Sequence, residues 1–311
     1  MKYALMFPGQ GSQSLGMLGD LDAPQIAATW QEAGEALGWD VGELVRGGPV
    51  EELNRTDRTQ PALLAASIAV WRVWTTRGRP APTVLAGHSL GEYSALVAAG
   101  SIDFGDALRL VEKRGQLMQA AVPPGTGGMA AVLGLDEPAM EALCTECSAG
   151  VLEPVNYNAP GQIVAAGEVT ALDWLEQEGP KAGAMKVVRL PVSVPSHCSL
   201  MREAAEQLGE ALEQIEIRAP QLPVLHNLDA EARDNPADIR QALREQLFKP
   251  VRWTRTLAAM QSLEVQALLE CGPGKVLCGL AKRGARGTTA IPLESTAGLE
   301  KADALMNEEL A

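Results

Sequence analysis

Short apolar segments alternate with longer, helix-like patterns along most of the chain. Apolar runs at residues 3–7, 83–86 and 265–270 are each followed within two residues by glycine or proline, which is typical of buried strands. Longer amphipathic patterns lie between them and predict helices. Strands that alternate with helices in this way predict an α/β fold with a central parallel sheet.

One predicted helix carries a charged side chain close to its apolar face. Asp103 precedes an apolar pattern of helical period at residues 104–121 and is predicted to cap that helix. Successive residues turn by about 100°, which places Arg114 about 60° from the centre of the apolar stripe. An arginine at such an edge more often extends its charge to water. It becomes a binding residue if the substrate carries a carboxylate, because the planar guanidinium forms two parallel bonds with one.

A second helix is predicted after Thr59 and through Trp74, following a turn at residues 55–57. Thr59 is predicted as its N-cap, and Pro61 lies just inside the helix, in the first turn, where its missing N–H costs nothing. Gln60 then lies in the first turn.

A different order of elements occupies residues 125–191. The pattern predicts strand, helix, strand, strand, helix and strand, at residues 129–133, 137–147, 151–156, 162–166, 171–178 and 185–190. This is the split order of a ferredoxin-like α+β domain. Because α/β alternation resumes afterwards, we expect it to be inserted into a discontinuous core of residues 1–124 and 192–311. The cleft between the two units is the expected binding site.

The motif Gly87-His88-Ser89-Leu90-Gly91 lies between a predicted strand and a predicted helix. This is the context of a nucleophile elbow, in which a serine occupies a tight strand-to-helix turn. The glycines provide the room that the strained turn needs. The helix N-terminus below Ser89 offers free N–H groups to a developing oxyanion. Ser89 is therefore the predicted nucleophile; the alternative is an ordinary glycine-flanked turn.

A serine nucleophile needs a base, and the chain has three histidines. His88 adjoins Ser89, so its side chain is expected to point away from it. His226 follows a predicted strand and is expected to be a packed or surface residue. His197 lies at the border of the inserted unit, before a helical pattern, and is the best candidate by position. No carboxylate near it in sequence is an obvious third member, so its acceptor could be a backbone carbonyl.

Three other motifs do not indicate a catalytic or metal site. Residues 8–13 form a glycine-rich turn after a strand, but the third glycine of a dinucleotide fingerprint is missing. Residues 272–277 resemble the end of a phosphate-binding loop, yet they lack its magnesium-binding hydroxyl, which excludes nucleotide hydrolysis. Cys144 and Cys147 lie in a helical pattern without a second pair, so we interpret them as core residues and expect no metal site.

Composition is that of a soluble globular protein, with 46% hydrophobic residues and no apolar run of membrane-spanning length. The net charge of −13 disfavours nucleic acid and anionic membranes as partners. Five widely spaced cysteines and the lack of a signal peptide predict a cytoplasmic protein with reduced thiols. Any acidic partner needs a local basic patch, and two clusters are candidates: Lys181, Lys186 and Arg189, and Lys275, Lys282, Arg283 and Arg286.

Taken together, these motifs resemble the malonyl-CoA:acyl-carrier-protein transacylase family. The matching segments span nearly the whole chain in the family's order and spacing. They are FPGQGSQ at 7–13, TQPA at 59–62, GHSLGEYSA at 87–95, EKRG at 112–115, PVSVPSHC at 191–198 and ECGPG at 270–274. The resemblance implies a hydrolase-like α/β core with a ferredoxin-like insert, which agrees with the predicted elements.

The resemblance also implies a role for each site residue. Ser89 attacks the thioester of malonyl-CoA, and His197 accepts its proton. The backbone N–H groups of Gln10 and Leu90 bind the oxyanion. Arg114 pairs with the malonyl carboxylate beside Gln60. Finally, the main-chain carbonyl that orients the base is placed at Gln246.

The implied reaction is a ping-pong transfer of malonyl to the phosphopantetheine thiol of acyl carrier protein, with no cofactor of the enzyme's own. Because acyl carrier protein is acidic, the two basic clusters are the candidate docking residues. We expect a monomer. Two alternatives are a serine hydrolase such as a thioesterase, which needs no cation near the core, and a binding module in which Ser89 is only a turn residue.

Overall fold

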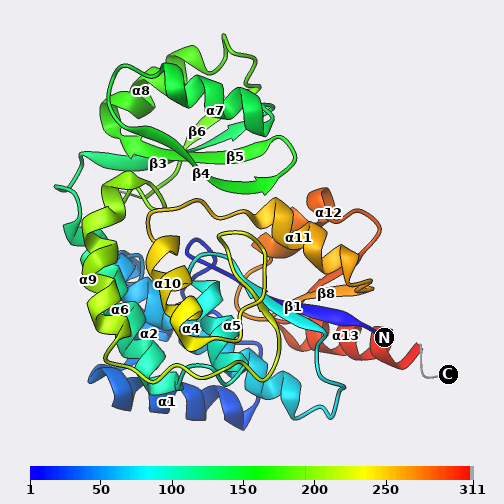
Figure 1. The fold of residues 1–311 in the computed structure, drawn as a ribbon. Coiled ribbons are helices and arrows are strands. Elements are labelled where there is room, and N and C mark those ends of the chain that lie inside the picture. Colours follow the sequence, from blue (N-terminus) through cyan, green and yellow to red (C-terminus); the bar gives the residue numbers. More distant parts are fainter. Residues whose placement is uncertain (193, 309–311) are drawn as a thin grey trace.

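A parallel sheet lies at the centre of the larger part of the molecule (Figure 1). The computed structural model describes residues 1–192 and 194–308. In these residues the sheet has the order β7-β2-β1-β8-β9, and every neighbouring pair is parallel. The strands are β1 (Tyr3–Phe7), β2 (Val84–Gly87), β7 (Val224–Leu225), β8 (Ala267–Glu270) and β9 (Thr289–Pro292). The predicted α/β class is confirmed.

Alternate side chains of β1 enter two different cores, because successive residues of a strand face opposite sides of a sheet. Tyr3, Leu5 and Phe7 pack into the larger core, and Ala4 and Met6 pack into the other. Figure 1 shows the helices that cover the sheet. They are α1 (Pro24–Leu37), α2 (Val41–Gly47), α3 (Val50–Leu53), α4 (Thr56–Thr75), α5 (Gly91–Ala98), α6 (Phe104–Ala120), α9 (Arg202–Leu212) after a 3₁₀ turn at Ser199–Met201, α10 (Pro236–Gln246), α11 (Trp253–Ser262), α12 (Val276–Gly284) and α13 (Thr296–Glu308).

The smaller sheet is antiparallel and has the order β4-β5-β3-β6. Its elements follow the predicted β-α-β-β-α-β order: β3 (Gly127–Leu133), α7 (Glu137–Glu146), β4 (Leu152–Ala159), β5 (Gln162–Glu168), α8 (Val169–Glu178) and β6 (Lys186–Arg189). Figure 1 places this unit, in green, above one end of the larger one. The exact division of the chain at residues 124/125 and 191/192 stays a prediction.

Backbone hydrogen bonds join the two units. Val251, which follows α10, donates to the Val155 carbonyl at 2.8 Å and accepts from the Tyr157 N–H at 2.9 Å. Strand β4 is therefore tied directly to the larger unit. No helix in the described ranges combines the length and the apolar character that a bilayer crossing needs.

The predicted start of the second helix is wrong. Helix α4 begins at Thr56, with Arg55 as its N-cap, so residues 56 and 57 of the expected turn are already helical. Thr59 instead donates its hydroxyl proton to the Leu53 carbonyl at 2.5 Å. Pro61 therefore lies inside the helix. Burial of this whole segment outweighed the local preference of proline for a first turn, as tertiary packing commonly does.

Three glycines allow close approaches of the backbone that shape the site. A Cβ on Gly87 would lie 1.8 Å from the Gly91 carbonyl carbon, and one on Gly91 would lie 2.0 Å from the Phe7 oxygen. A Cβ on Gly115 would lie 2.6 Å from the Asp57 Cα, so this glycine lets α6 pack closely on α4. The first pair makes the turn at Ser89 possible, and the third brings α6 against Gln60.

Gly87→Ala is expected to destabilise the protein by about 4 kcal/mol or more, because backbone must move to admit the methyl group. Thermal unfolding measures this. Gly279→Ala is the matched control, since a Cβ there meets nothing within 4 Å in helix α12. The control should gain about 0.5–1 kcal/mol through helix propensity. Equal melting temperatures for the two variants would contradict the steric account of the turn.

Candidate active site

Ser89 occupies the turn between β2 and α5 with a φ of 52°. Left-handed backbone is uncommon for a serine and is typical of functional turns. Its N–H donates to the Asn227 side-chain oxygen at 2.7 Å, and Asn227 in turn donates to the Gly87 carbonyl at 2.6 Å. The strained turn is thus held by a buried amide from the loop after β7.

His197 lies beside the Ser89 hydroxyl. Its Nε2 is 2.7 Å from Ser89 Oγ, and its Nδ1 is 2.6 Å from the main-chain oxygen of Gln246. A carbonyl can only accept, so Nδ1 carries the proton and Nε2 presents its lone pair to the hydroxyl. His197 N also donates to the Leu247 carbonyl at 3.0 Å. The imidazole is therefore oriented as a general base for Ser89.

The acceptor for His197 comes from a helix C-terminus. Gln246 is the last residue of α10, where carbonyls have no partner within the helix. This end carries partial negative charge, which favours an imidazolium as it forms. The helix end can therefore do what an aspartate does in other serine enzymes. Burial and the nearby Arg114 charge lower the pKa of His197 to about 3, so the resting imidazole is neutral.

Arg114 lies inside the site and is only 1% exposed. Its guanidinium donates to Gln60 Oε1 at 2.8 Å, to Gln246 Oε1 at 3.0 Å and to Ser89 Oγ at 3.4 Å, and it lies over the Tyr93 ring at 5.4 Å. Burial lowers the pKa of Arg114 from its usual value, but a guanidinium stays charged at neutral pH. Within the described residues no carboxylate lies within ion-pair distance of it.

A small cavity of about 110 Å³ contains these groups. Gln10, Leu90, Met118 and Ser196 also line it. In the described chain the main-chain N–H groups of Gln10 and Leu90 donate no hydrogen bond. The cavity therefore brings together a hydroxyl, a base, a cation and two free amide donors.

Sequence reasoning missed a buried polar network beneath Ser89. Glu92 is 1% exposed, its Oε2 accepts from Asn227 N and Gln246 Nε2, both at 2.9 Å, and its Oε1 is 2.7 Å from His226 Nδ1. In sequence, Glu92 resembles an ordinary acidic residue of a first helical turn. The one available signal was Asn227, a polar residue at the carboxyl end of a strand, where open α/β sheets place their sites.

The remaining histidines do not contact the serine hydroxyl. His88 Nε2 lies 2.8 Å from Asn158 Oδ1, and burial lowers the pKa of His88. His226 is fully buried against Glu92. Cys144 and Cys147 are free thiols near the end of α7, and the described residues contain no cluster of metal-ligand type.

A wider cleft of about 360 Å³ continues from the small cavity toward the surface. The two share Gln10, His88, Asn156, Leu190 and Val192. One wall comes from β4 and β5 of the smaller unit, and the opposite wall includes residues of α12. Asn156 Oδ1 is buried here without a partner in the described part of the chain. The serine is therefore reached along a passage between the two units.

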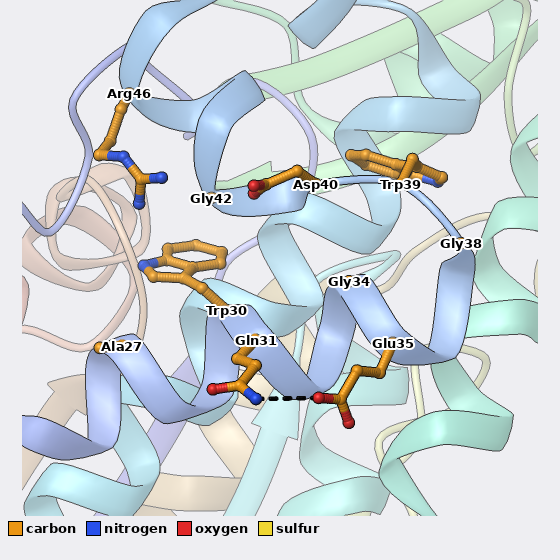
Figure 2. Close-up of a pocket in the computed structure, with 10 residues that line it drawn as sticks. All are labelled: Ala27, Trp30, Gln31, Gly34, Glu35, Gly38, Trp39, Asp40, Gly42 and Arg46. Carbon is orange, nitrogen blue, oxygen red and sulfur yellow. Dashed lines mark hydrogen bonds between the residues drawn. The ribbon is translucent and has the colours of Figure 1, made fainter.

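A separate hollow of about 530 Å³ lies between α1 and α2 (Figure 2). The Trp30 ring faces Arg46 across it, and Gln31 donates to Glu35 at 2.9 Å. Its ten lining residues include no serine, histidine or cysteine. Its carboxylates, Glu35 and Asp40, have no hydroxyl or thiol beside them in the lining, whereas the cleft at Ser89 places a hydroxyl and a base together.

An elbow serine, a histidine at its hydroxyl and two unpartnered amide donors on an α/β fold are typical of an acyl-transferring serine enzyme. The protein family described as acyl transferase domain matches residues 4–309. The chain belongs to this family.

Relatives share nearly the full length of the chain. A malonyl CoA-acyl carrier protein transacylase of Salmonella typhimurium is 50% identical over 304 residues, which are 97% of this chain and 98% of that protein. The Bacillus subtilis protein of the same name is 40% identical, over 99% and 98% of the two chains. Two solved structures each have a TM-score of 0.95 and 50% identity over 97% of this chain. They are an acyl carrier protein S-malonyltransferase of Vibrio cholerae, covered over 100% of its chain, and a malonyl-transacylase in complex with a type II PKS acyl-carrier protein, covered over 99%.

Because the pKa of His197 is lowered, the base is expected to stay unprotonated well below pH 6.5. The rate at which a neutral fluorophosphonate labels Ser89 should therefore remain nearly constant from pH 8 to about pH 5. Labelling kinetics measured by mass spectrometry test this, with His197→Ala as the variant that lacks the base. A half-loss of the rate near pH 6.5 would show an ordinary, unshifted imidazole.

Proposed function

We propose that this chain transfers a malonyl group from malonyl-CoA to the phosphopantetheine thiol of acyl carrier protein, the loading step of fatty acid synthesis. The single observation that carries this proposal is a buried guanidinium 3.4 Å from the hydroxyl of an activated serine. A cation there suits an acyl group that ends in a carboxylate. Family membership and the names of the relatives support the same substrate and carrier.

In the first half-reaction, Ser89 Oγ attacks the thioester carbonyl while His197 Nε2 takes its proton. The carbonyl oxygen becomes an oxyanion that accepts from the Gln10 and Leu90 N–H groups. One such donor is typically worth about 3 kcal/mol of barrier. The tetrahedral intermediate then collapses, the carbon–sulfur bond breaks, and His197 returns the proton to the departing CoA thiolate. A malonyl ester on Ser89 remains.

The second half-reaction reverses these steps with a new thiol. The phosphopantetheine sulfur enters along the cleft, gives its proton to His197 and attacks the ester carbonyl. The ester bond breaks, and Ser89 recovers its proton from the imidazolium. The passage suits this arm because pantetheine carries two amides, and Asn156 and Asn158 offer carboxamides along its wall. No step requires a cofactor.

The substrate carboxylate also strengthens the base. In the resting site, the Arg114 charge disfavours an imidazolium at His197. A malonyl carboxylate that pairs with Arg114 offsets this charge and favours proton transfer to His197. Gln60 holds the other side of the guanidinium at 2.8 Å. Arg114 therefore selects malonyl in two ways, by direct pairing and by its effect on the base.

The protein is expected to work as a cytoplasmic monomer. A reducing compartment suits its five free cysteines, four of which are buried. Every group named in the mechanism comes from a single chain.

Arg114→Ala is expected to lower kcat/KM for malonyl transfer by about a hundredfold or more, since it removes a bidentate charge pair. Acetyl transfer should fall far less, because acetyl has no carboxylate. Steady-state kinetics with both acyl-CoA substrates make the comparison. Arg109→Ala is the matched control, an exposed arginine on the same helix. Equal losses for the two acyl groups would remove the argument for a carboxylate-binding arginine.

We also propose that the carrier docks at α12 rather than at β6. Helix α12 contributes Val276, Leu277 and Leu280 to the cleft, and its basic residues are exposed. The guanidinium of Arg189 is already paired with Asp173 and Glu176.

Lys275→Glu is expected to raise the apparent KM for acyl carrier protein by about two- to fivefold at low salt, as for a charge at an interface rim. Lys113→Glu makes the same charge change at an exposed position on α6, on the other side of the molecule in Figure 1, and should have little effect. Free pantetheine is an uncharged acceptor, so it should react at the same rate with the Lys275→Glu and Lys113→Glu variants. Equal KM values for the carrier would exclude docking at Lys275.

A further inference from the structure

Gln246 joins three parts of the active site. Its main-chain oxygen accepts from His197 Nδ1 at 2.6 Å. Its side-chain Oε1 accepts from Arg114 at 3.0 Å, and its Nε2 donates to the Ser89 carbonyl at 3.0 Å. One residue therefore touches the base, the guanidinium and the nucleophile turn. The orientation of its side-chain amide sets the last two of these contacts.

Glu92 fixes the orientation of that amide. The Glu92 carboxylate accepts from Gln246 Nε2 at 2.9 Å, and a carboxylate offers no donor in return. The NH₂ group of Gln246 must then face Glu92, which leaves its oxygen to face Arg114. Turning the amide over would place oxygen against the Glu92 carboxylate and the Ser89 carbonyl. It would also place an NH₂ group against a guanidinium.

Glu92 itself has a rigid setting. It is 1% exposed, the Asn227 N–H donates to it at 2.9 Å, and His226 Nδ1 lies 2.7 Å from its other oxygen. Buried charges need compensation, and each of these contacts suits an ionised carboxylate. The same Asn227 holds the Ser89 N–H through its side chain.

The Glu92 and Arg114 side chains lie close together but form no direct ion pair. Gln246 lies between them and bonds to both. A carboxylate in direct contact with Arg114 would occupy the donors that a substrate carboxylate needs. A carboxylate one residue away compensates the buried cation without occupying any of its N–H groups.

We propose that Glu92 is a positioning residue for acyl-group selection, which acts through the Gln246 side chain to hold Arg114 ready for a substrate carboxylate. This inference rests on the role given above to Arg114. It assigns Glu92 no contact with the substrate. The main-chain bond from Gln246 to His197 does not depend on the side-chain amide, so general-base catalysis should persist when Glu92 is changed.

Glu92→Gln keeps the shape and removes the charge. It also adds an NH₂ group where only donors surround the carboxylate. Malonyl kcat/KM is expected to fall by about 10- to 100-fold, the range for losing a hydrogen bond to a charged group. Acetyl kcat/KM should change by less than about threefold. The measured quantity is the ratio of malonyl to acetyl kcat/KM, which a loss of general stability would leave unchanged.

A double-mutant cycle with Gln246→Met tests the route of the effect. Gln246→Met keeps the main-chain oxygen and removes both side-chain bonds, so it should lower the same ratio. If Glu92 acts through Gln246, the double variant has about the same ratio as Gln246→Met alone. If the double variant lowers the malonyl-to-acetyl ratio by the product of the two single losses, the proposal is overturned. Equal losses of kcat/KM for malonyl and acetyl in Glu92→Gln would also overturn it.

Two controls keep the test decisive. Ser94→Ala changes another fully buried side chain of α5, whose hydroxyl has no partner in the described residues, and should keep the wild-type ratio.

If Glu92→Gln does not fold, Gln246→Met carries the test, and an unchanged ratio in that variant overturns the proposal. The unaltered protein is assayed in parallel. Its failure to transfer malonyl would contradict the proposed function, whereas normal transfer with unshifted ratios in the variants would contradict this inference alone.

Discussion

The active site depends on one hydrogen bond, from the His197 imidazole to the last main-chain carbonyl of helix α10. A carbonyl cannot take a proton, so this bond fixes the tautomer of the base permanently. The partial negative charge of the helix end then favours the imidazolium that forms during proton transfer. Because α10 also packs its final side chain against Arg114 and Glu92, the same helix end sets the geometry of the base and of the cation.

This arrangement buries charged and polar groups, which is unfavourable unless they find partners. Arg114, Glu92 and Gln246 are each 1% exposed, and burial works against both charges. Hydrogen bonds satisfy most of their polar atoms, but the guanidinium has no carboxylate in direct contact within the described ranges. A substrate that brings its own carboxylate completes the set. In the proposed mechanism, selection of malonyl follows from this unpaired buried cation in the resting enzyme, rather than from the shape of the cavity alone.

Local patterns in the sequence were enough for the fold class and for the elbow. Glycines at 87 and 91 are required because a Cβ there would lie 1.8 and 2.0 Å from neighbouring backbone atoms, and their spacing is visible in the chain. The start of α4 was mispredicted because burial of the segment overrode the preference of Pro61 for a first turn. Glu92 and Asn227 were missed because their contacts join residues more than 130 positions apart, and neither spacing nor periodicity reports such pairs. Gln246 was placed by resemblance to a family, since a main-chain carbonyl leaves no mark in a sequence.

The central claim is that Ser89 carries the acyl group between the two thiols. The most direct measurement is intact-protein mass spectrometry after brief exposure to malonyl-CoA, followed by peptide mapping. The account predicts a single malonyl adduct on Ser89, which disappears when acyl carrier protein is added and does not form in Ser89→Ala. Absence of an adduct on a protein that still transfers malonyl, or an adduct on another residue, would contradict it.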